Sequence, residues 1–420
     1  MSSSVEPKIT RKSTQRIVIG LFALAVLLLG YQYLRNLGTD TRPLFGGGDS
    51  TGFVAAVLEK DDGGSQVVLI KEDGTLMESP GYVTGATDRE PAWPADGRFL
   101  YFISDRAQGQ SHVFRWAFKD GVVERRSLDK RTKAMPWFPP DTYPDASKLG
   151  IVVSGGKVIQ FDPQNLEARQ LLPPVGKEIG GGDEGSISQF DQAYSSLGTS
   201  VREAKWGKDK AWIAAVLRRE NGGEVLVVQD SAGEKPPTPV AFGTKVEFDV
   251  NAAEGGLIYC VQGLEFPNPE TVPKEFIKDG KIIKPFLHGV GFFNPDQESV
   301  GYIATSKEDK IVFGTPKVSP DGSTLVMLVG ELDGESFKAR SLVTLPARVG
   351  GSDAVARLLD GNISSPSWNG DGSKIVYIKL FDGKRAVHTI NKDGSEERNL
   401  TGDKGDFIQP SFSPKTRSVQ

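Results

Sequence analysis

A short pattern recurs along this chain and constrains its fold more than any other feature of the sequence. An apolar anchor residue is followed three residues later by Asp and four residues later by Gly, and an apolar strand begins two or three residues after that. The clearest copies are Trp93 with Asp96 and Gly97, Val318 with Asp321 and Gly322, and Trp368 with Asp371 and Gly372. Asp bonds to nearby backbone N–H groups, and Gly adopts the left-handed conformation without steric cost. Each copy therefore predicts a strand, a tight turn and a second strand.

Weaker copies of the pattern fill the intervals between the clear ones. Trp206 with Asp209 is one, and Phe412 begins a last one that lacks the Asp-Gly pair. Two more are degenerate, at Trp137 (with a displaced Pro144-Asp145) and at Phe248. Each copy has room for about four short strands, as in a propeller blade. One such sheet leaves a face bare, so the copies are expected to stack around a ring.

The anchors predict the number of blades and the way the ring closes. They lie at positions 93, 137, 206, 248, 318, 368 and 412. The last copy has room for one strand, whereas residues 52–80 supply three strands without an anchor. We therefore expect an all-β propeller of seven four-stranded blades, closed by one C-terminal strand on three N-terminal ones. Six blades would follow if a degenerate anchor is false, and eight if Phe293 starts a blade.

The N-terminal segment reads as a membrane anchor. Residues 17–34 form an uncharged, largely apolar run of 18 residues, long enough to span a bilayer. Four basic residues precede the run and two follow it, which predicts a cytoplasmic N-terminus. The predicted parts are thus a cytoplasmic segment 1–16, a transmembrane signal anchor 17–34, a flexible tether 35–51 and the propeller 52–420. The alternative is a cleaved signal peptide, but its small-residue motif at 23–25 lies inside the apolar run.

The repeat resembles that of the TolB-like propeller family. The resemblance is carried by Pro91 and Trp93 with their Asp-Gly turn, the apolar strand that follows, and the run Ser104-Asp105-Arg106. It covers roughly residues 52–420. It implies a periplasmic propeller that binds protein partners or peptides, often at one mouth of the ring. The chain departs from TolB itself, because a tether rather than an α/β domain precedes the strands.

No catalytic centre, cofactor site or metal site is predicted. His112, His288 and His388 fall in three different repeats without the close spacing that metal ligands show. The sequence around Ser186 lacks the strand-turn-helix setting of a nucleophile elbow. Cys260 lies in an apolar strand and is expected to be a buried small residue.

Charge and insertions indicate a binding role. The first fifty residues carry a net charge of +3 and the remainder −7, so the body lacks the basic surface that nucleic-acid binding requires. Two insertions interrupt the repeats, near 176–200 and 265–298. The second is rich in Pro and Phe, and Phe276, Phe286, Phe292 and Phe293 are its predicted partner-binding residues. We expect an inner-membrane protein whose extracytoplasmic propeller binds another envelope or membrane protein. The alternative is a lyase or glycan hydrolase that uses the ring mouth.

The anchor prediction is tested by topology mapping. An export-dependent reporter fused after Gln420 should be active only outside the cytoplasm, and the mature protein should retain residues 1–30 when sequenced. Recovery of a soluble form that starts near Ala25 would show that the segment is a cleaved signal instead.

Overall fold

The computed structural model describes residues 53–107, 109–117, 121–126, 142–145, 150–162, 167–173, 196–232, 235–267, 277–348, 351–381 and 383–414. Those between Asp49 and Gln420 belong to one compact unit. The predicted membrane segment 17–34 and the anchor Trp137 lie outside the described residues. Within the described part, no helix has the length and apolar character needed to cross a bilayer.

The second strand of each repeat explains why the sheets assemble. In β2 (Ser65–Ile70) every residue is buried, and in β13 (Trp212–Arg218) only the last is exposed. A strand buried on both faces needs a packed neighbour on each side. The apolar clusters accordingly join residues of adjacent sheets, as in the cluster that packs Val376 and Ile378 against Val54 and Val68.

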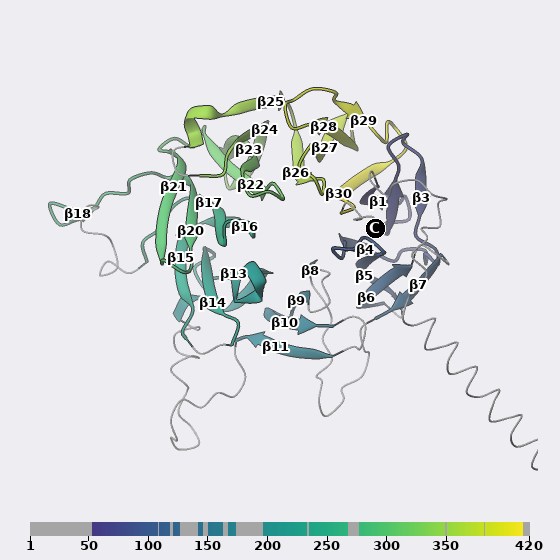
Figure 1. The fold of residues 1–420 in the computed structure, drawn as a ribbon, viewed down its shortest axis with the longest axis horizontal. Coiled ribbons are helices and arrows are strands. Elements are labelled where there is room, and N and C mark those ends of the chain that lie inside the picture. Colours follow the sequence, from purple (N-terminus) through teal and green to yellow (C-terminus); the bar gives the residue numbers. More distant parts are fainter. Residues whose placement is uncertain are drawn as a thin grey trace, which may run out of the picture. The chain divides into compact units, whose positions relative to one another are not determined.

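Seven four-stranded antiparallel sheets form a ring in the described residues, which confirms the predicted propeller and its number of blades (Figure 1). Blade 1 contains β1 (Val54–Glu59), β2, β3 (Leu76–Glu78) and β30 (Asp406–Phe412), and blade 2 contains β4 (Asp88–Ala92), β5 (Phe99–Ala107), β6 (Gln110–Ala117) and β7 (Val122–Arg125). Blade 3 contains β8 (Thr142–Asp145), β9 (Gly150–Ser154), β10 (Lys157–Phe161) and β11 (Ala168–Leu172), and blade 4 contains β12 (Ser200–Trp206), β13, β14 (Glu224–Asp230) and β15 (Thr238–Gly243).

The remaining blades follow the same order from the innermost strand outward. Blade 5 contains β16 (Lys245–Asn251), β17 (Gly256–Gln262), β20 (His288–Asn294) and β21 (Ser299–Ser306). Blade 6 contains β22 (Val312–Val318), β23 (Thr324–Asp333), β24 (Ser336–Pro346) and β25 (Ala356–Asp360), and blade 7 contains β26 (Ile363–Trp368), β27 (Lys374–Phe381), β28 (Lys384–Asn391) and β29 (Arg398–Asn399). Two short 3-10 helices, η1 (Lys208–Lys210) and η4 (Gly351–Ala354), lie between strands.

Blade 5 corrects the expectation of a long insertion at 265–298. Strand β20 is the third strand of this blade, so the insertion ends before His288, and Phe293 lies within β20 rather than at the start of an eighth blade. What remains between β17 and β20 includes a separate hairpin of β18 (Ile277–Lys278) and β19 (Lys281–Ile282). Its turn places Asp279 and Gly280 at positive φ, as the hairpin turn of type I′ requires.

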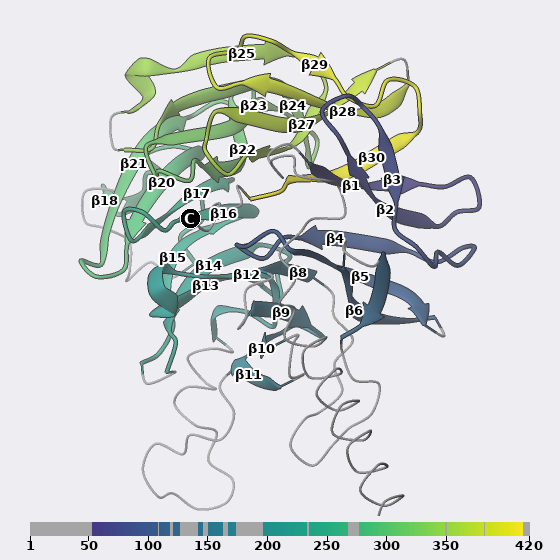
Figure 2. The ribbon, with the colours of Figure 1, turned by 45° about the vertical axis from the view of Figure 1, so that its right-hand side comes forward.

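The ring closes where β30 pairs antiparallel with β1, which is the one-plus-three arrangement expected from the repeats (Figure 2). Val54 lies opposite Phe412 and Leu58 opposite Phe407 in this pairing. Arg385 of blade 7 adds a side-chain contact, because it donates to Asp406 at 2.6 and 2.8 Å and also reaches Glu59. The first and last strands of the propeller are thus held by backbone pairing and by one shared guanidinium.

A buried ion pair within blade 2 also accepts a hydrogen bond from blade 1. Asp88 is fully buried, and its carboxylate contacts the guanidinium of Arg106 at 2.5 Å and accepts a hydrogen bond from the backbone N–H of Val67 at 3.0 Å. Arg106 also lies over the rings of Phe102 and Phe114. Arg106 ends the Ser104-Asp105-Arg106 run of the repeat, so this motif fixes one blade to the next.

Removal of the closing strand tests this arrangement. Deletion of residues 406–420 should leave β1 with an unpaired edge, and the protein should aggregate and melt at a lower temperature. Deletion of 415–420 alone is the matched control and should change neither property. Light scattering and thermal unfolding check the result, and a monomeric 406–420 deletion with an unchanged melting temperature would contradict the closure.

Candidate functional site

The innermost strands share a bulge three residues before the anchor. Glu90, Thr315, Ser365 and Gln409 occupy this position, which we call the bulge position, and each has a positive φ of 50–54° and precedes a proline. The strand pairing shifts register at each of them, as expected for an inserted residue. Non-glycine residues in this conformation store backbone strain, and such strain persists only where the surroundings compensate it.

At two of these positions, a side chain of the neighbouring blade satisfies the backbone. The side chain of Gln409 in blade 1 accepts a hydrogen bond from the backbone N–H of Glu90 in blade 2 at 2.8 Å, and its amide donates to the Glu90 carboxylate at 3.0 Å. Glu247 of blade 5 likewise accepts the N–H of Thr315 in blade 6 at 2.7 Å. The backbone groups that the bulges release are therefore satisfied from the neighbouring blade, and polar side chains gather around the centre of the ring.

Charged residues lie next to the anchors in blades 4, 5 and 6. Lys205 and Lys317 come just before Trp206 and Val318, whereas Asp249 comes just after Phe248. The ammonium of Lys205 lies 2.9 Å from one carboxylate oxygen of Asp249, and the other oxygen accepts the N–H of Val318 at 2.9 Å. We call Lys205, Asp249 and Lys317 the channel charge cluster.

Burial and charge act against each other in this cluster. Burial alone would lower the pKa of Lys205, but the carboxylates of Asp249 and Glu203 outweigh it and raise the pKa. Burial would raise the pKa of Asp249, but Lys205 and Lys317 lower it. The positive charge of Lys205, followed by burial, lowers the pKa of Lys317. Two cations therefore share the negative charge of Asp249, which makes that carboxylate indispensable to the cluster.

A cavity opens at the end of the ring where the innermost strands end. All of these strands run in the same direction because every blade has the same strand order, so their anchors lie at one end, which we call the anchor mouth. The cavity there has a volume of about 300 Å³. Its lining comes from blades 6, 7, 1 and 2 and consists of Pro91, Ala92, Trp93, Pro320, Trp368, Asn369, Gly370, Ser411, Phe412 and Pro414.

The anchor tryptophans hold this lining in place. The indole N–H of Trp93 donates to the carbonyl of Ser411 in blade 1 at 3.2 Å, and that of Trp368 donates to the carbonyl of Lys317 in blade 6 at 2.9 Å. Asn369 is also engaged, because its side chain accepts the N–H of Lys374 at 2.9 Å and donates to Ser373 at 3.0 Å. The cavity is therefore lined by prolines, aromatic rings and polar groups that already have partners.

The turns after the anchors have the hydrogen bonds and backbone conformations that the repeat predicts. Asp321 accepts hydrogen bonds from Ser319 and Ser323, and Asp371 accepts from Ser373 in the same way. Gly97, Gly322 and Gly372 have positive φ values of 63°, 77° and 71°. In blade 4, Lys210 stands at the position that glycine occupies in the clear copies, and Asp209 and Lys210 have positive φ values of 52° and 58°. Trp206 packs against the core between blades 3 and 4.

The aromatic residues predicted to bind a partner do not form an exposed group. Phe286 and Phe293 are both only 3% exposed and belong to the core between blades 4 and 5, while Phe292 packs against the core between blades 5 and 6. Phe276 lies outside the described residues. The expectation fails for Phe286 and Phe293 because a third strand crosses the segment and buries them. The exposed apolar residues of this region are Ile277, Ile282 and Ile283.

The histidines lie far apart and are buried. His288 contacts Asp309 at 3.0 Å and accepts the N–H of Gly263 at 3.2 Å. His388 lies beside the ring of Tyr377 and 3.3 Å from Glu397, and burial lowers its pKa. His112 is buried on β6. Among the described residues, no three His, Cys, Asp or Glu side chains converge as a metal site would require.

Sequence reasoning missed the bulge position and the channel charge cluster. The signal was present as charged residues at alternate positions of strands that otherwise read as apolar, namely Glu203 with Lys205 and Glu247 with Asp249. Alternate residues of a strand share a face, so these pairs pointed to a common polar surface. The x-Pro pair that precedes four of the anchors was the second signal.

Fold and site together define a seven-bladed propeller with a polar centre and a cavity of mixed polar and apolar lining at one mouth. No family model matches the chain. Its repeats are TolB-like. A stretch of 65 residues is 35% identical to the Tol-Pal system protein TolB of Francisella tularensis subsp. mediasiatica and, equally, of subsp. tularensis, and it covers 16% of this chain and 15% of each relative. The chain thus matches about a sixth of the length of these curated relatives, and the similarity does not identify it with TolB itself.

Solved structures with a similar arrangement have low sequence identity to this chain. TolB from Acinetobacter baumannii is 14% identical, with a TM-score of 0.47, over 88% of this chain and 68% of that one. Oligogalacturonate lyase from Vibrio parahaemolyticus is 11% identical, with a TM-score of 0.45, over 83% of this chain and 84% of that one.

Substitution of Asp249 tests the channel charge cluster. Asp249→Asn should leave Lys205 and Lys317 without their shared carboxylate and lower the free energy of unfolding by about 3 kcal/mol. Because the pKa of Asp249 is lowered in the folded state, its contribution should be full above the unfolded value of about 3.9 and lost as the pH falls through the lower folded value. Chemical denaturation over a pH series measures both effects. Adding Lys317→Met should recover part of the loss, and an unchanged stability in Asp249→Asn would contradict the analysis.

Proposed function

We propose that this chain is a protein-binding module of the cell envelope and that it captures a segment of a partner protein at the anchor mouth. The observation that carries the proposal is the cavity of about 300 Å³ between Trp93, Trp368 and Phe412. Its size falls at the lower end of the range for ligand sites. A cavity of this size accepts one or two side chains of a peptide.

The chemistry of the lining favours binding over catalysis. None of the lining residues has a side chain that titrates near neutral pH, whereas acid–base catalysis requires a group that donates or accepts a proton. The neighbouring charges of Lys205 and Asp249 are engaged with each other. We therefore place the protein among binding modules rather than among propeller enzymes such as lyases or glycan hydrolases.

The position in the cell follows from the sequence. The uncharged run 17–34 and the preceding basic residues support a single-pass inner-membrane anchor with the propeller in the periplasm or extracytoplasmic space. The TolB-like repeats agree with an envelope location. The partner on this proposal is another envelope or membrane protein, held close to the membrane by the tether 35–51.

Blocking the anchor mouth tests the proposal. Ser411 lines the cavity and is partly exposed, so Ser411→Trp should fill the cavity without disturbing the carbonyl that accepts from Trp93. Partners crosslinked in cells and identified by mass spectrometry should be lost with this variant. Ser364→Trp, at an exposed position toward the other end of an innermost strand, is the matched control and should retain them.

Both variants should melt at the wild-type temperature, which separates blocked binding from misfolding. Retention of the same partners by a folded Ser411→Trp variant would contradict binding at the anchor mouth. Turnover of an oligosaccharide by the purified protein would favour the enzyme alternative.

A further inference from the structure

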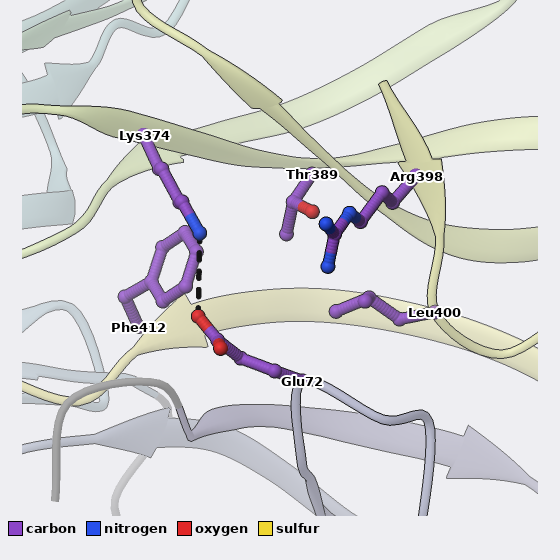
Figure 3. Close-up of a pocket in the computed structure, with 6 residues that line it drawn as sticks. All are labelled: Glu72, Lys374, Thr389, Arg398, Leu400 and Phe412. Atoms are coloured by element: carbon purple, nitrogen blue, oxygen red, sulfur yellow. Dashed lines mark hydrogen bonds and ion pairs between the residues drawn. The ribbon is translucent and has the colours of Figure 1, made fainter. Parts of the chain in front are cut away.

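A second, narrower cleft lies beside the anchor mouth, at the seam between blade 7 and blade 1. It is lined by Glu72, Lys374, Thr389, Arg398, Leu400 and Phe412, and we call it the seam cleft (Figure 3). Phe412 lines both the seam cleft and the mouth cavity, so the two adjoin across one aromatic ring. The enclosed volume of about 10 Å³ admits a single small polar group.

The seam cleft carries one positive charge in excess. Lys374 is paired with Glu72 at 3.3 Å, whereas the guanidinium of Arg398 has no hydrogen bond or ion pair to any of the described residues. Figure 3 shows the side chains of Arg398 and Lys374 extending into the same opening, with the hydroxyl of Thr389 beside the guanidinium. Leu400 and Phe412 supply an apolar border. A cation, a hydroxyl and an apolar border together suit an anionic oxygen.

We propose that the seam cleft binds a carboxylate on the peptide whose apolar side chain fills the mouth cavity; this inference rests on the proposed function. Arg and carboxylate form strong paired hydrogen bonds because the planar fork of the guanidinium matches both oxygens. The single negative charge of a carboxylate balances the excess charge of Lys374, Arg398 and Glu72. A phosphate dianion would exceed this excess charge and leave the cleft with a net negative charge.

The partner segment is therefore an extended peptide with an apolar or proline residue and a nearby acidic residue. Successive side chains of an extended peptide point to opposite sides, so the two residues reach adjoining pockets when they are close neighbours in sequence. Trp93 and Trp368 use their indole N–H groups within the ring, and Trp368 is 8% exposed. Trp368 therefore offers little ring surface for stacking a sugar, which favours a peptide over an acidic oligosaccharide.

The test begins with a display library of random linear peptides selected on the full chain in detergent. Selected peptides should share an acidic residue close to an apolar or proline residue. A synthetic peptide with that consensus should bind Arg398→Gln about three- to tenfold more weakly than the wild type. The same peptide with its acidic residue changed to the amide should bind both proteins equally. Arg357→Gln, an exposed arginine on the outer strand of blade 6, is the matched control and should leave affinity unchanged.

The outcomes separate this inference from the proposed function. A peptide that no longer binds Ser411→Trp requires an open mouth. If such a peptide binds Arg398→Gln with wild-type affinity, the assignment of the seam cleft is wrong and the proposed binding at the anchor mouth stands. Peptides whose affinity is unchanged by Ser411→Trp would contradict both the seam-cleft assignment and the proposed binding at the anchor mouth. Oligogalacturonate is the competing probe. If this sugar binds, its binding depends on Arg398 and no peptide binds, then the assignment to a peptide is wrong. Thermal unfolding of each variant confirms that the ring is folded.

Discussion

The backbone N–H group that a bulge releases is the constraint on which the centre of this propeller depends. The proline after Glu90, Thr315, Ser365 and Gln409 cannot donate to the strand ladder, and the residue before it adopts a strained conformation. A buried donor without a partner costs free energy comparable to a lost hydrogen bond. The side chains of Gln409 and Glu247 remove that cost in the next blade. Contacts between neighbouring blades at the bulges are therefore polar and directional, whereas the second strands of neighbouring blades pack through apolar clusters.

The distribution of polar and small side chains around the ring centre determines where the ring can bind other molecules. Blades 4 to 6 place Lys205, Asp249 and Lys317 next to their anchors, and these charges interact with one another. Blades 2 and 1 place the small residues Ala92 and Ser411 just before their anchors, which leaves the mouth cavity open. Residues next to the anchors thus form a charged wall on one side of the ring and line an open recess on the other. Binding at the recess needs no rearrangement of the charged wall.

The repeat made the fold predictable from sequence, but the site was predictable only in part. The Asp-Gly turns and the apolar second strands depend on local chemistry, so seven blades and their closure could be deduced from spacing. The segment around Phe286 and Phe293 could not be assigned in the same way, because a third strand of the blade and an exposed insertion can both be rich in aromatic residues. Only the pairing of β20 with β17 shows that these rings are buried. The mouth cavity joins residues of four blades that are far apart in sequence, and no local pattern encodes that contact.

Because β30 closes the ring, the blades become complete in a fixed order during synthesis of the chain. A chain that emerges from its N-terminus exposes β1, β2 and β3 long before β30 exists, so blade 1 is incomplete until residues 406–412 have been made. The strands of blades 2 to 7 follow one another in the chain, apart from the hairpin of β18 and β19 within blade 5, and each of these blades can form as its strands appear. The bare edge of β1 is then open to other strands for the whole time of synthesis. A nascent or prematurely ended chain is consequently the form of this protein most in need of a chaperone.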